Sequence, residues 1–317
     1  MKFSGNTPMV EIVYSYEGAK KSVFAKLEYY NPTGSIKDRF AEYALKKAAE
    51  RGDLAEGQPI IEVTSGNTGI AMAALGGRTG HPVHIFMPDW ASAERRSLME
   101  MYGAKVYPVS REEGGFAGAF IKAEKLAKEI GGYLPKQFEN PDNAWAHYYG
   151  TGTEILKDLP NVTDFVAGIG TGGTIMGVGR ILKEKRQAKI TAVEPDSLQL
   201  LTTGKVLGPH KIEGIGDDFI PPLVDRSLLD EVLDINDDDA AAMAAMLAAE
   251  LGLGVGISSG ANFLGAILEN RLPDRVVSTV FTDDNKKYLS TSLANPPVIT
   301  EKMLSSKVTL LDVRRIL

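Results

Sequence analysis

Apolar residues recur along the chain with two different periods. Short runs that are apolar at consecutive positions, such as PIIEVT at 59–64 and PVHIFMP at 82–88, have the length of buried strands. Longer segments with helical periodicity lie between such runs, for example SIKDRFAEYALKKAAERG at 35–52. Strands that are apolar on both faces and alternate with helices form parallel sheets covered on both sides. The pattern therefore predicts an α/β protein with two three-layer α/β domains and mostly parallel sheets.

Composition narrows the class of partner. The chain has 317 residues, 44% hydrophobic and 24% charged, which is typical of a globular protein with about two domains. A net charge of -6 argues against nucleic acid and membrane surfaces as partners, and no apolar run is long enough to cross a bilayer. The chain has no cysteine and four histidines, so we expect neither disulfides nor a metal site. The start of the chain lacks the apolar core of a signal peptide, so we expect a cytoplasmic protein.

The first candidate for chemistry is a lysine at the start of a helix. NPTGSIKDRF at 31–40 places Lys37 in the first turn of a helix that we expect to begin at Ser35, because Ser35 and Asp38 resemble a capping box. The helix dipole and Arg39 would both disfavour the charged amine and lower its pKa. A neutral lysine can attack a carbonyl carbon and form a Schiff base. The alternative is a solvated lysine with Asp38 as its counter-ion.

Two glycine turns join strands to helices. TSGNTG at 64–69 offers backbone N–H groups and side-chain donors, which suits a carboxylate. GTGGT at 170–174 offers a helix start with three glycines, which suits a phosphate group. The second turn matches neither the dinucleotide fingerprint nor the Walker loop. An ordinary structural turn is the alternative for both.

A serine completes the set. SSG at 258–260 opens the helix GANFLGAIL, and Ser258 either caps that helix or offers a neutral hydroxyl to a ligand. Pyridoxal 5'-phosphate requires an amine for its aldehyde, a loop for its phosphate and a partner for its ring nitrogen. Its amino-acid substrate requires a site for the carboxylate. The four stretches together therefore predict a pyridoxal-phosphate enzyme that acts on an amino-acid substrate.

The ordered motifs resemble a known family. NPTGSIKDR, TSGNTG, GTGGT and GISSG, accompanied by MPDWASAERR, QFENPDN, AVEP and KIEGIG, are similar to motifs of the cysteine synthase (O-acetylserine sulfhydrylase) and cystathionine β-synthase family, which has fold type II. The resemblance runs from residue 5 to residue 291. It implies a fold like the tryptophan synthase β-subunit, and a homodimer. The smaller mobile domain would be 35–146, the larger cofactor-binding domain 1–34 and 147–300, and the tail 301–317.

The resemblance also implies roles for single residues. Lys37 would be the internal Schiff-base lysine and the proton carrier, Asn67 would bond the 3'-hydroxyl of the cofactor, and Ser258 would face the pyridine nitrogen. The phosphate would be held by Gly170, Thr171, Gly172, Gly173 and Thr174. The substrate carboxylate would be bound by Thr64, Ser65, Gly66, Thr68 and Gln137.

The implied reaction is β-replacement on an L-serine derivative through an α-aminoacrylate intermediate. The foremost candidate is cysteine synthase, which converts O-acetylserine and sulfide to cysteine and acetate. A neutral hydroxyl at Ser258 agrees with this reaction, because it leaves the pyridine nitrogen largely unprotonated. The ring is then a weaker electron sink, which favours loss of a β-substituent over transamination.

One loop departs from the family pattern. GIGDDF at 214–219 carries Asp217 and Asp218 where cysteine synthases commonly have small neutral residues. They are either solvated loop acids or include a general base that lines the site and repels hydrosulfide. The second possibility suggests an alternative function, in which cysteine releases hydrogen sulfide and the product is serine, lanthionine or cystathionine.

Two other classes stay open from the sequence. A serine or threonine dehydratase would use the same cofactor, but NPTGSIKDR counts against it. A non-catalytic phosphate-binding or interaction protein would use the glycine turns without a Schiff base.

Overall fold

A seven-stranded sheet forms the larger part of the molecule. In the computed structural model, which describes residues 3–316, its strand order is β10-β7-β6-β11-β2-β1-β12. The five strands from β10 to β2 run parallel, while β1 pairs antiparallel with both β2 and β12. The bounds are β1 Met9–Tyr16, β2 Ala19–Leu27, β6 Asp164–Gly168, β7 Lys189–Pro195, β10 Glu231–Ile235, β11 Val277–Phe281 and β12 Val308–Ile316.

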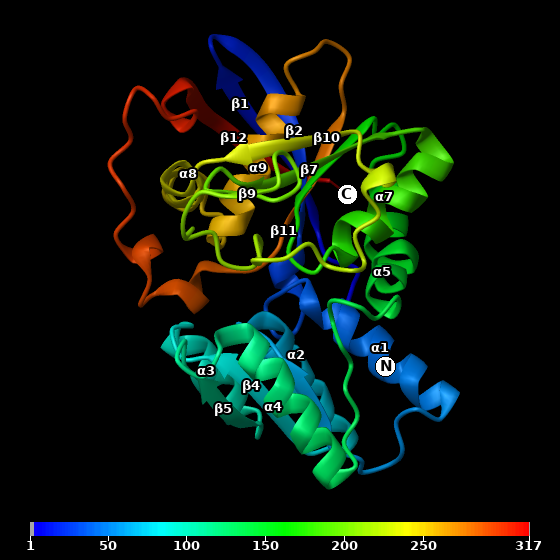
Figure 1. Cartoon of the computed structure of the whole chain (residues 1–317). Helices are drawn as coiled ribbons and strands as arrows, with labels where there is room; N and C mark the ends of the chain where they lie inside the picture. Colours follow the sequence, from blue (N-terminus) through cyan, green and yellow to red (C-terminus); the bar gives the residue numbers. More distant parts are fainter. Residues whose placement is uncertain (1–2, 317) are drawn as a thin grey trace.

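Helices cover both faces of this sheet (Figure 1). Helices α8 (Asp237–Leu251) and α9 (Ile257–Glu269) pack on one face, with Phe263 and Leu264 fully buried among the sheet residues. On the other face α7 (Gly173–Arg186) buries Ile175 and Leu182. The result is a three-layer body with an apolar core on each side of the sheet.

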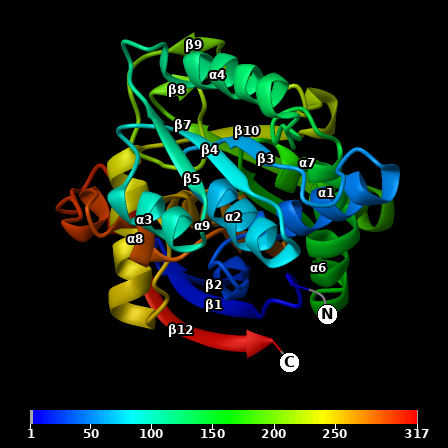
Figure 2. The same ribbon diagram turned by 90° about the horizontal axis from the view of Figure 1, so that it is seen from below.

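A smaller unit contains the parallel sheet β3-β4-β5 (Figure 2). Helices α1, α2 and α3 pack on one face of this sheet, and α4 packs on the other. The bounds are α1 Lys37–Arg51, β3 Ile60–Val63, α2 Asn67–Thr79, β4 Val83–Pro88, α3 Ala93–Met101, β5 Lys105–Val109 and α4 Gly115–Ile130. The predicted α/β class, with mostly parallel sheets in three-layer units, is therefore confirmed.

The chain crosses from the smaller unit to the larger one through an interrupted helix. Helix α5 (Asp142–Ala146) continues into a π-helical stretch (His147–Gly152) and then into α6 (Thr153–Asp158). Gly152 lies in this stretch because a Cβ there would collide with Ile181 of α7. No helix in the described residues 3–316 is long and apolar enough to cross a membrane.

The tail forms the last strand of the larger sheet. Val308 pairs with Tyr16 and Ile316 pairs with Met9, so β12 lies along the outer side of β1. The register shifts between Val13 and Tyr14, where the pair has a bulge. The pairing of β12 with β1 therefore closes this edge of the larger sheet with a strand from near the end of the described residues (Figure 2).

Candidate active site

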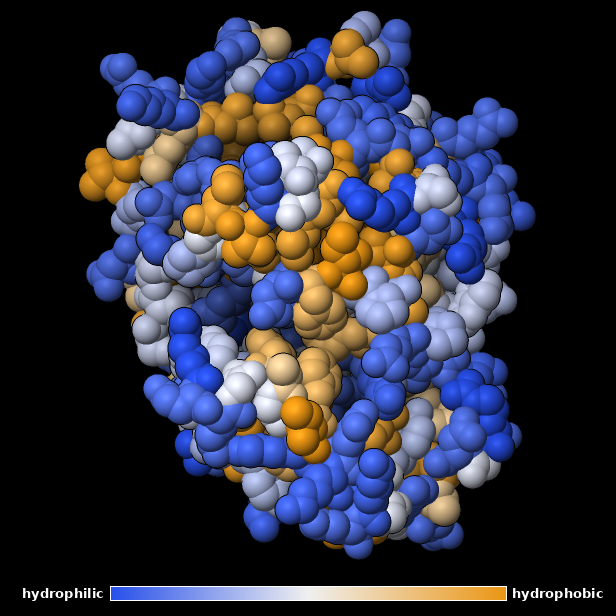
Figure 3. Space-filling view, in the orientation of Figure 1, coloured by the Kyte–Doolittle hydropathy of each residue, from blue (hydrophilic) through white to orange (hydrophobic). Residues whose placement is uncertain are grey.

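A pocket lies at the junction of the two units, where the surface is hollowed (Figure 3). The carboxyl ends of parallel strands face this junction, which is where α/β sheets bind ligands. Ten of the residues predicted for the site line the pocket: Lys37, Thr64, Ser65, Asn67, Thr68, Gln137, Gly170, Thr171, Asp217 and Ser258. Gly66, Gly172, Gly173, Thr174 and Asp218 do not line it.

Lys37 is the first residue of α1 and is half-buried at the pocket wall. Its backbone N–H donates to Ser35 Oγ at 3.3 Å. Burial lowers the pKa of the Lys37 amine, while the charges of Asp283 and Asp217 oppose this by raising it. The predicted direction of the pKa shift is therefore present, and desolvation is its main cause.

The predicted capping box and the predicted effect of Arg39 are both wrong. Asp38 accepts a hydrogen bond from the Thr33 N–H at 2.7 Å, so it neither caps α1 nor serves as a counter-ion of Lys37. Arg39 is buried with its Nε 2.6 Å from Glu28 Oε2, and Glu154 also binds it. The Arg39 charge is therefore neutralised within this cluster, which anchors α1 on the larger unit.

The predicted carboxylate site surrounds the start of α2. Thr68 Oγ1 donates to Gln137 Oε1 at 2.5 Å, and Gln137 Nε2 donates to the Val63 carbonyl at 2.8 Å. Thr64 Oγ1 accepts from the Gly66 N–H at 3.0 Å. These contacts hold the side chains in place around the first turn of α2, whose backbone N–H groups favour an anion.

Gly66 serves packing in this turn. A Cβ at this position would collide with the Arg95 side chain, which passes directly beneath it. The glycine therefore makes room for a buried arginine at the pocket wall.

The predicted phosphate loop precedes α7. Gly172 has a left-handed backbone with φ 84°, which favours glycine. A Cβ at Gly170 would collide with the Gly214 carbonyl, and a Cβ at Gly173 would collide with Asn143. Asn143 Nδ2 also donates to Thr171 Oγ1 at 3.0 Å. The glycines are thus required by close contacts within the chain, and Gly170 and Thr171 line the pocket just before the start of the 14-residue helix α7.

Ser258 does not cap α9. It lies inside the helix, after the N-cap Gly256, and its side chain is buried against the pocket. Ser258 Oγ and Thr282 Oγ1 share a hydrogen bond of 2.8 Å. The hydrogen-bonding group at this position of the pocket is therefore a pair of neutral hydroxyls.

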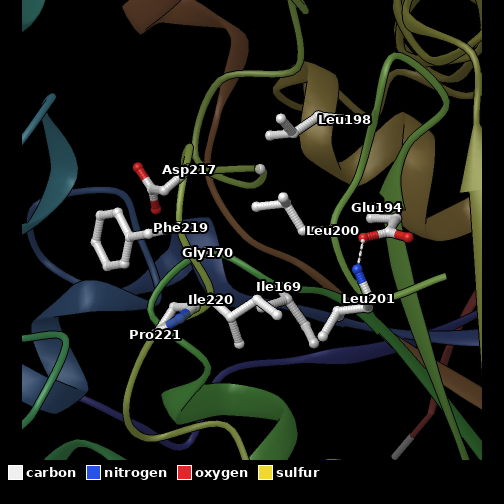
Figure 4. Close-up of a pocket in the computed structure, with 11 residues that line it drawn as sticks. Ile169, Gly170, Glu194, Leu198, Leu200, Leu201, Asp217, Phe219, Ile220 and Pro221 are labelled. Carbon is white, nitrogen blue, oxygen red and sulfur yellow. Dashed lines mark hydrogen bonds between the residues drawn. The ribbon is translucent and has the colours of Figure 1, made fainter. Parts of the chain in front are cut away.

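The structure separates the two loop acids. Asp217 lines the pocket and is half-buried, whereas Asp218 is exposed. Burial raises the pKa of Asp217 to about 6, and the Asp218 charge adds to this while Lys37 and His210 oppose it. A neighbouring cavity shares Asp217 and Gly170 with the pocket. In Figure 4, which shows this cavity, the Asp217 carboxylate points away from Leu198.

Three charged residues at the site were missed. Arg95 of α3 is buried, forms an ion pair with Glu213 and lies 4.5 Å from the centre of the Tyr288 ring. Arg95 and Glu213 belong to the motifs MPDWASAERR and KIEGIG, but neither motif indicates that they meet. Asp283 is fully buried behind Asn67, and its sequence context, two acids after an apolar strand, gave no sign of burial.

Comparisons with known proteins agree with this geometry. A family model described as pyridoxal-phosphate dependent enzyme matches residues 1–283. Cysteine synthase B of Campylobacter jejuni is 43% identical over 296 residues, which cover 91% of this chain and 96% of that protein. The solved structure of a hydrogen sulfide-producing enzyme from Fusobacterium nucleatum has a TM-score of 0.94 at 51% identity, covering 99% of this chain and 97% of that chain. Cysteine synthase from Entamoeba histolytica has a TM-score of 0.88 at 37% identity, with 96% and 93% covered.

Proposed function

Because the chain belongs to the pyridoxal-phosphate-dependent enzymes, in the cysteine synthase and cystathionine β-synthase family, we propose that it replaces the β-substituent of an L-serine derivative. The enzyme is of the cysteine synthase class. Its foremost reaction is the synthesis of cysteine and acetate from O-acetylserine and sulfide. One observation carries the proposal: the half-buried Lys37, whose pKa is lowered, shares one pocket with the segments that open α2 and precede α7.

The residues around the pocket fit pyridoxal phosphate. Within residues 3–316, Asn67 Oδ1 is buried without a hydrogen-bond partner, which leaves an acceptor for a ligand hydroxyl. The loop Gly170–Thr174 would hold the phosphate at the start of α7, and Ser258 would meet the ring nitrogen with a neutral hydroxyl. The proposed roles of Asn67, the loop and Ser258 are those that the motifs led us to expect.

Lys37 would perform the proton transfers. When bound, the cofactor supplies an aldehyde carbon that joins an amine and a ring that withdraws electrons. The lowered pKa leaves part of the Lys37 amine neutral, so its nitrogen can take the substrate α-proton and later return it. Thr64, Ser65, Thr68 and Gln137 would hold the substrate carboxylate at the start of α2. This fixes the α-carbon relative to Lys37.

A second function is favoured by Asp217. With a pKa of about 6, its carboxylate is mostly ionised at neutral pH. A negative charge in the pocket repels hydrosulfide, and it can accept a proton from water or from a thiol. Asp217 would therefore support the release of hydrogen sulfide from cysteine, with serine, lanthionine or cystathionine as the product. The 51% identical enzyme from F. nucleatum is described as hydrogen sulfide-producing.

A substrate panel tests both functions. O-acetylserine, O-phosphoserine, serine and cysteine are each combined with sulfide, homocysteine or water, and the products are identified by mass spectrometry. We expect the highest kcat/KM for O-acetylserine with sulfide. Turnover of cysteine alone, with no reaction between O-acetylserine and sulfide, would overturn the first function and support the second. Lys37→Ala, which removes the amine, serves as the inactive control in every reaction.

Assembly and motion complete the proposal. The smaller domain, 35–146, would move against the larger one, and the Arg95–Glu213 ion pair would hold the two together across the pocket entrance.

The enzyme would act as a homodimer in the cytoplasm. Light scattering after gel filtration tests the dimer: a mass of twice 34.2 kDa is expected, and a single copy would contradict it.

A further inference from the structure

Asp283 is a fully buried acid placed shortly after the carboxyl end of β11. Its backbone is fixed on two sides, because it forms a β-bridge with Ser35 and its carbonyl accepts from the Gly256 N–H at 3.1 Å. The two neighbours lie just before α1 and α9. Asp283 is therefore held between the segment that carries Lys37 and the segment that carries Ser258.

The carboxylate makes two hydrogen bonds through one oxygen. Asp283 Oδ2 accepts from Asn67 Nδ2 and from the Tyr288 hydroxyl, each at 2.7 Å. Asp283 Oδ1 has no partner within residues 3–316 and lies against Gly256, where a Cβ would collide with it. A buried carboxylate with one oxygen unsatisfied is costly for stability, so we expect Asp283 to have a role other than stabilising the fold.

The charge of Asp283 acts on two amines, those of the half-buried Lys37 and the buried Lys287. It raises the pKa of Lys37 and of Lys287, in both cases against the lowering effect of burial. Lys287 Nζ in turn donates to the Gly34 carbonyl at 2.7 Å, in the loop before α1. The acid thus lies at the centre of the charged groups behind the pocket, although it does not line the pocket itself.

Asp283 determines how the Asn67 amide is oriented. An amide has a donor end and an acceptor end, whereas an ionised carboxylate only accepts. The Asn67 nitrogen must therefore face Asp283, which leaves the Asn67 carbonyl oxygen and its second N–H for the pocket. Without the carboxylate, nothing in this contact would prevent the amide from turning over.

We propose that Asp283 is a positioning residue for the cofactor, because it holds the Asn67 nitrogen and thereby fixes which Asn67 atoms are free to bind the cofactor hydroxyl. The inference rests on the proposed role of Asn67. It also joins the two units, since Asn67 begins α2 of the smaller unit and Asp283 follows β11 of the larger one. The same hydrogen bond therefore links cofactor binding to the placement of the smaller unit.

A double-mutant cycle tests this role by cofactor binding alone. The apoenzymes of the wild type, Asp283→Asn, Asn67→Ala and the double variant are titrated with pyridoxal phosphate, and Kd and the visible absorbance maximum are measured. We expect Asp283→Asn to raise Kd about tenfold and to shift the absorbance maximum, because a hydrogen bond to a charged group is lost. In the Asn67→Ala background, the same substitution should change Kd by less than about twofold, since its effect passes through Asn67.

Asp284→Asn is the matched control. It removes one negative charge at the next position, where the side chain caps the turn that contains Lys286; among the described residues, Asn67 donates to Asp283 and not to Asp284. Its Kd should stay within about twofold of the wild type. The proposal is overturned if Asp283→Asn leaves Kd and the absorbance unchanged, or if its effect multiplies with that of Asn67→Ala.

A second variant serves if Asp283→Asn does not fold. In the exchange variant Asn67→Asp with Asp283→Asn, an amide and a carboxylate still face each other, so the apoenzyme should keep its melting temperature. The carboxylate now lies at the pocket, so Kd should rise at least tenfold. An exchange variant with wild-type Kd would overturn the proposal. No amino-acid substrate is present in these titrations, so an error in the proposed reaction would leave the results unaffected.

Discussion

Lys37 and Asp217 line the same pocket, and the charge of each shifts the pKa of the other. The Asp217 carboxylate raises the pKa of Lys37, and the Lys37 ammonium lowers the pKa of Asp217. Burial exceeds both effects, since it lowers the pKa of the lysine and raises that of the acid to about 6. The pocket therefore contains an amine that loses its proton easily and a carboxyl that ionises close to neutral pH.

The pKa of Asp217 predicts a pH dependence for sulfide release from cysteine. A base acts only when ionised, so the rate should fall as the pH drops below about 6. Asp217→Asn should lower kcat/KM about 100-fold and abolish this dependence. Asp218→Asn is the control: the rate should stay within a few fold, but the fall should move to lower pH, because the Asp218 charge raises the pKa of Asp217. A wild-type profile in Asp217→Asn would remove this acid from the mechanism.

Loss of Glu213 should destabilise the junction between the units. Glu213→Gln would leave the buried Arg95 guanidinium without its anionic partner, at a cost of about 2 kcal/mol in the free energy of unfolding. Urea unfolding measures this. Glu100→Gln breaks the exposed Arg96–Glu100 pair of the same helix and should change stability by less than about 0.5 kcal/mol. Equal losses in the free energy of unfolding for both substitutions would show that the buried pair stabilises the fold no more than the exposed pair.

The glycine loop before α7 should not tolerate a methyl group at Gly170. Gly170→Ala would force a Cβ against the Gly214 carbonyl, which is backbone and cannot move aside freely. We expect a loss of about 2 kcal/mol in stability, accompanied by weaker binding of pyridoxal phosphate, measured by thermal unfolding and by titration. At Gly208 a Cβ would meet open space, so Gly208→Ala should behave like the wild type in both measurements. Normal binding in Gly170→Ala would contradict the tight geometry of the loop.

Glu62 should make stability depend on pH. This acid of β3 is buried, and burial raises its pKa from 4.5 to about 8, although hydrogen bonds from the backbone of Val63 and of Gln137 oppose this. A raised folded-state pKa contributes stability below about pH 4.5 that is lost as the pH rises through about 8. Glu62→Gln cannot ionise, so its free energy of unfolding should exceed that of the wild type by about 2 kcal/mol at pH 7 and match it at pH 4. An equal difference at both pH values would mean that Glu62 does not titrate in this range.

The order of strands and helices was predictable because parallel strands are apolar throughout and helices have their own period. The same topology explains why Lys37, Asn67, Gly170 and Ser258 were predicted together, since turns at the carboxyl ends of parallel strands converge. Sequence spacing places a residue on an element and near an edge. This spacing was sufficient to predict that the four residues would line one pocket, and their types indicated a pyridoxal-phosphate site.

The remaining features depend on tertiary contacts that spacing does not encode. Arg39 was expected to act on Lys37, but Glu28 and Glu154 approach it from distant segments and neutralise it. The choice between Asp217 and Asp218 depends on the path of one loop, which turns only Asp217 toward the pocket. Asp283 resembled a surface acid because the tyrosine and asparagine that bind it come from different elements.

The pairing of β12 with β1 has a consequence for the order of synthesis. The smaller unit is continuous in the chain and can fold while the ribosome still holds the rest, whereas the outer edge of β1 stays unpaired until β12 emerges. During that interval β1 presents an unpaired edge to other nascent chains. A protein that ends at Lys307 should therefore aggregate, as measured by turbidity on refolding, while the full chain stays clear. A strand translated late in synthesis thus protects a strand that was made early.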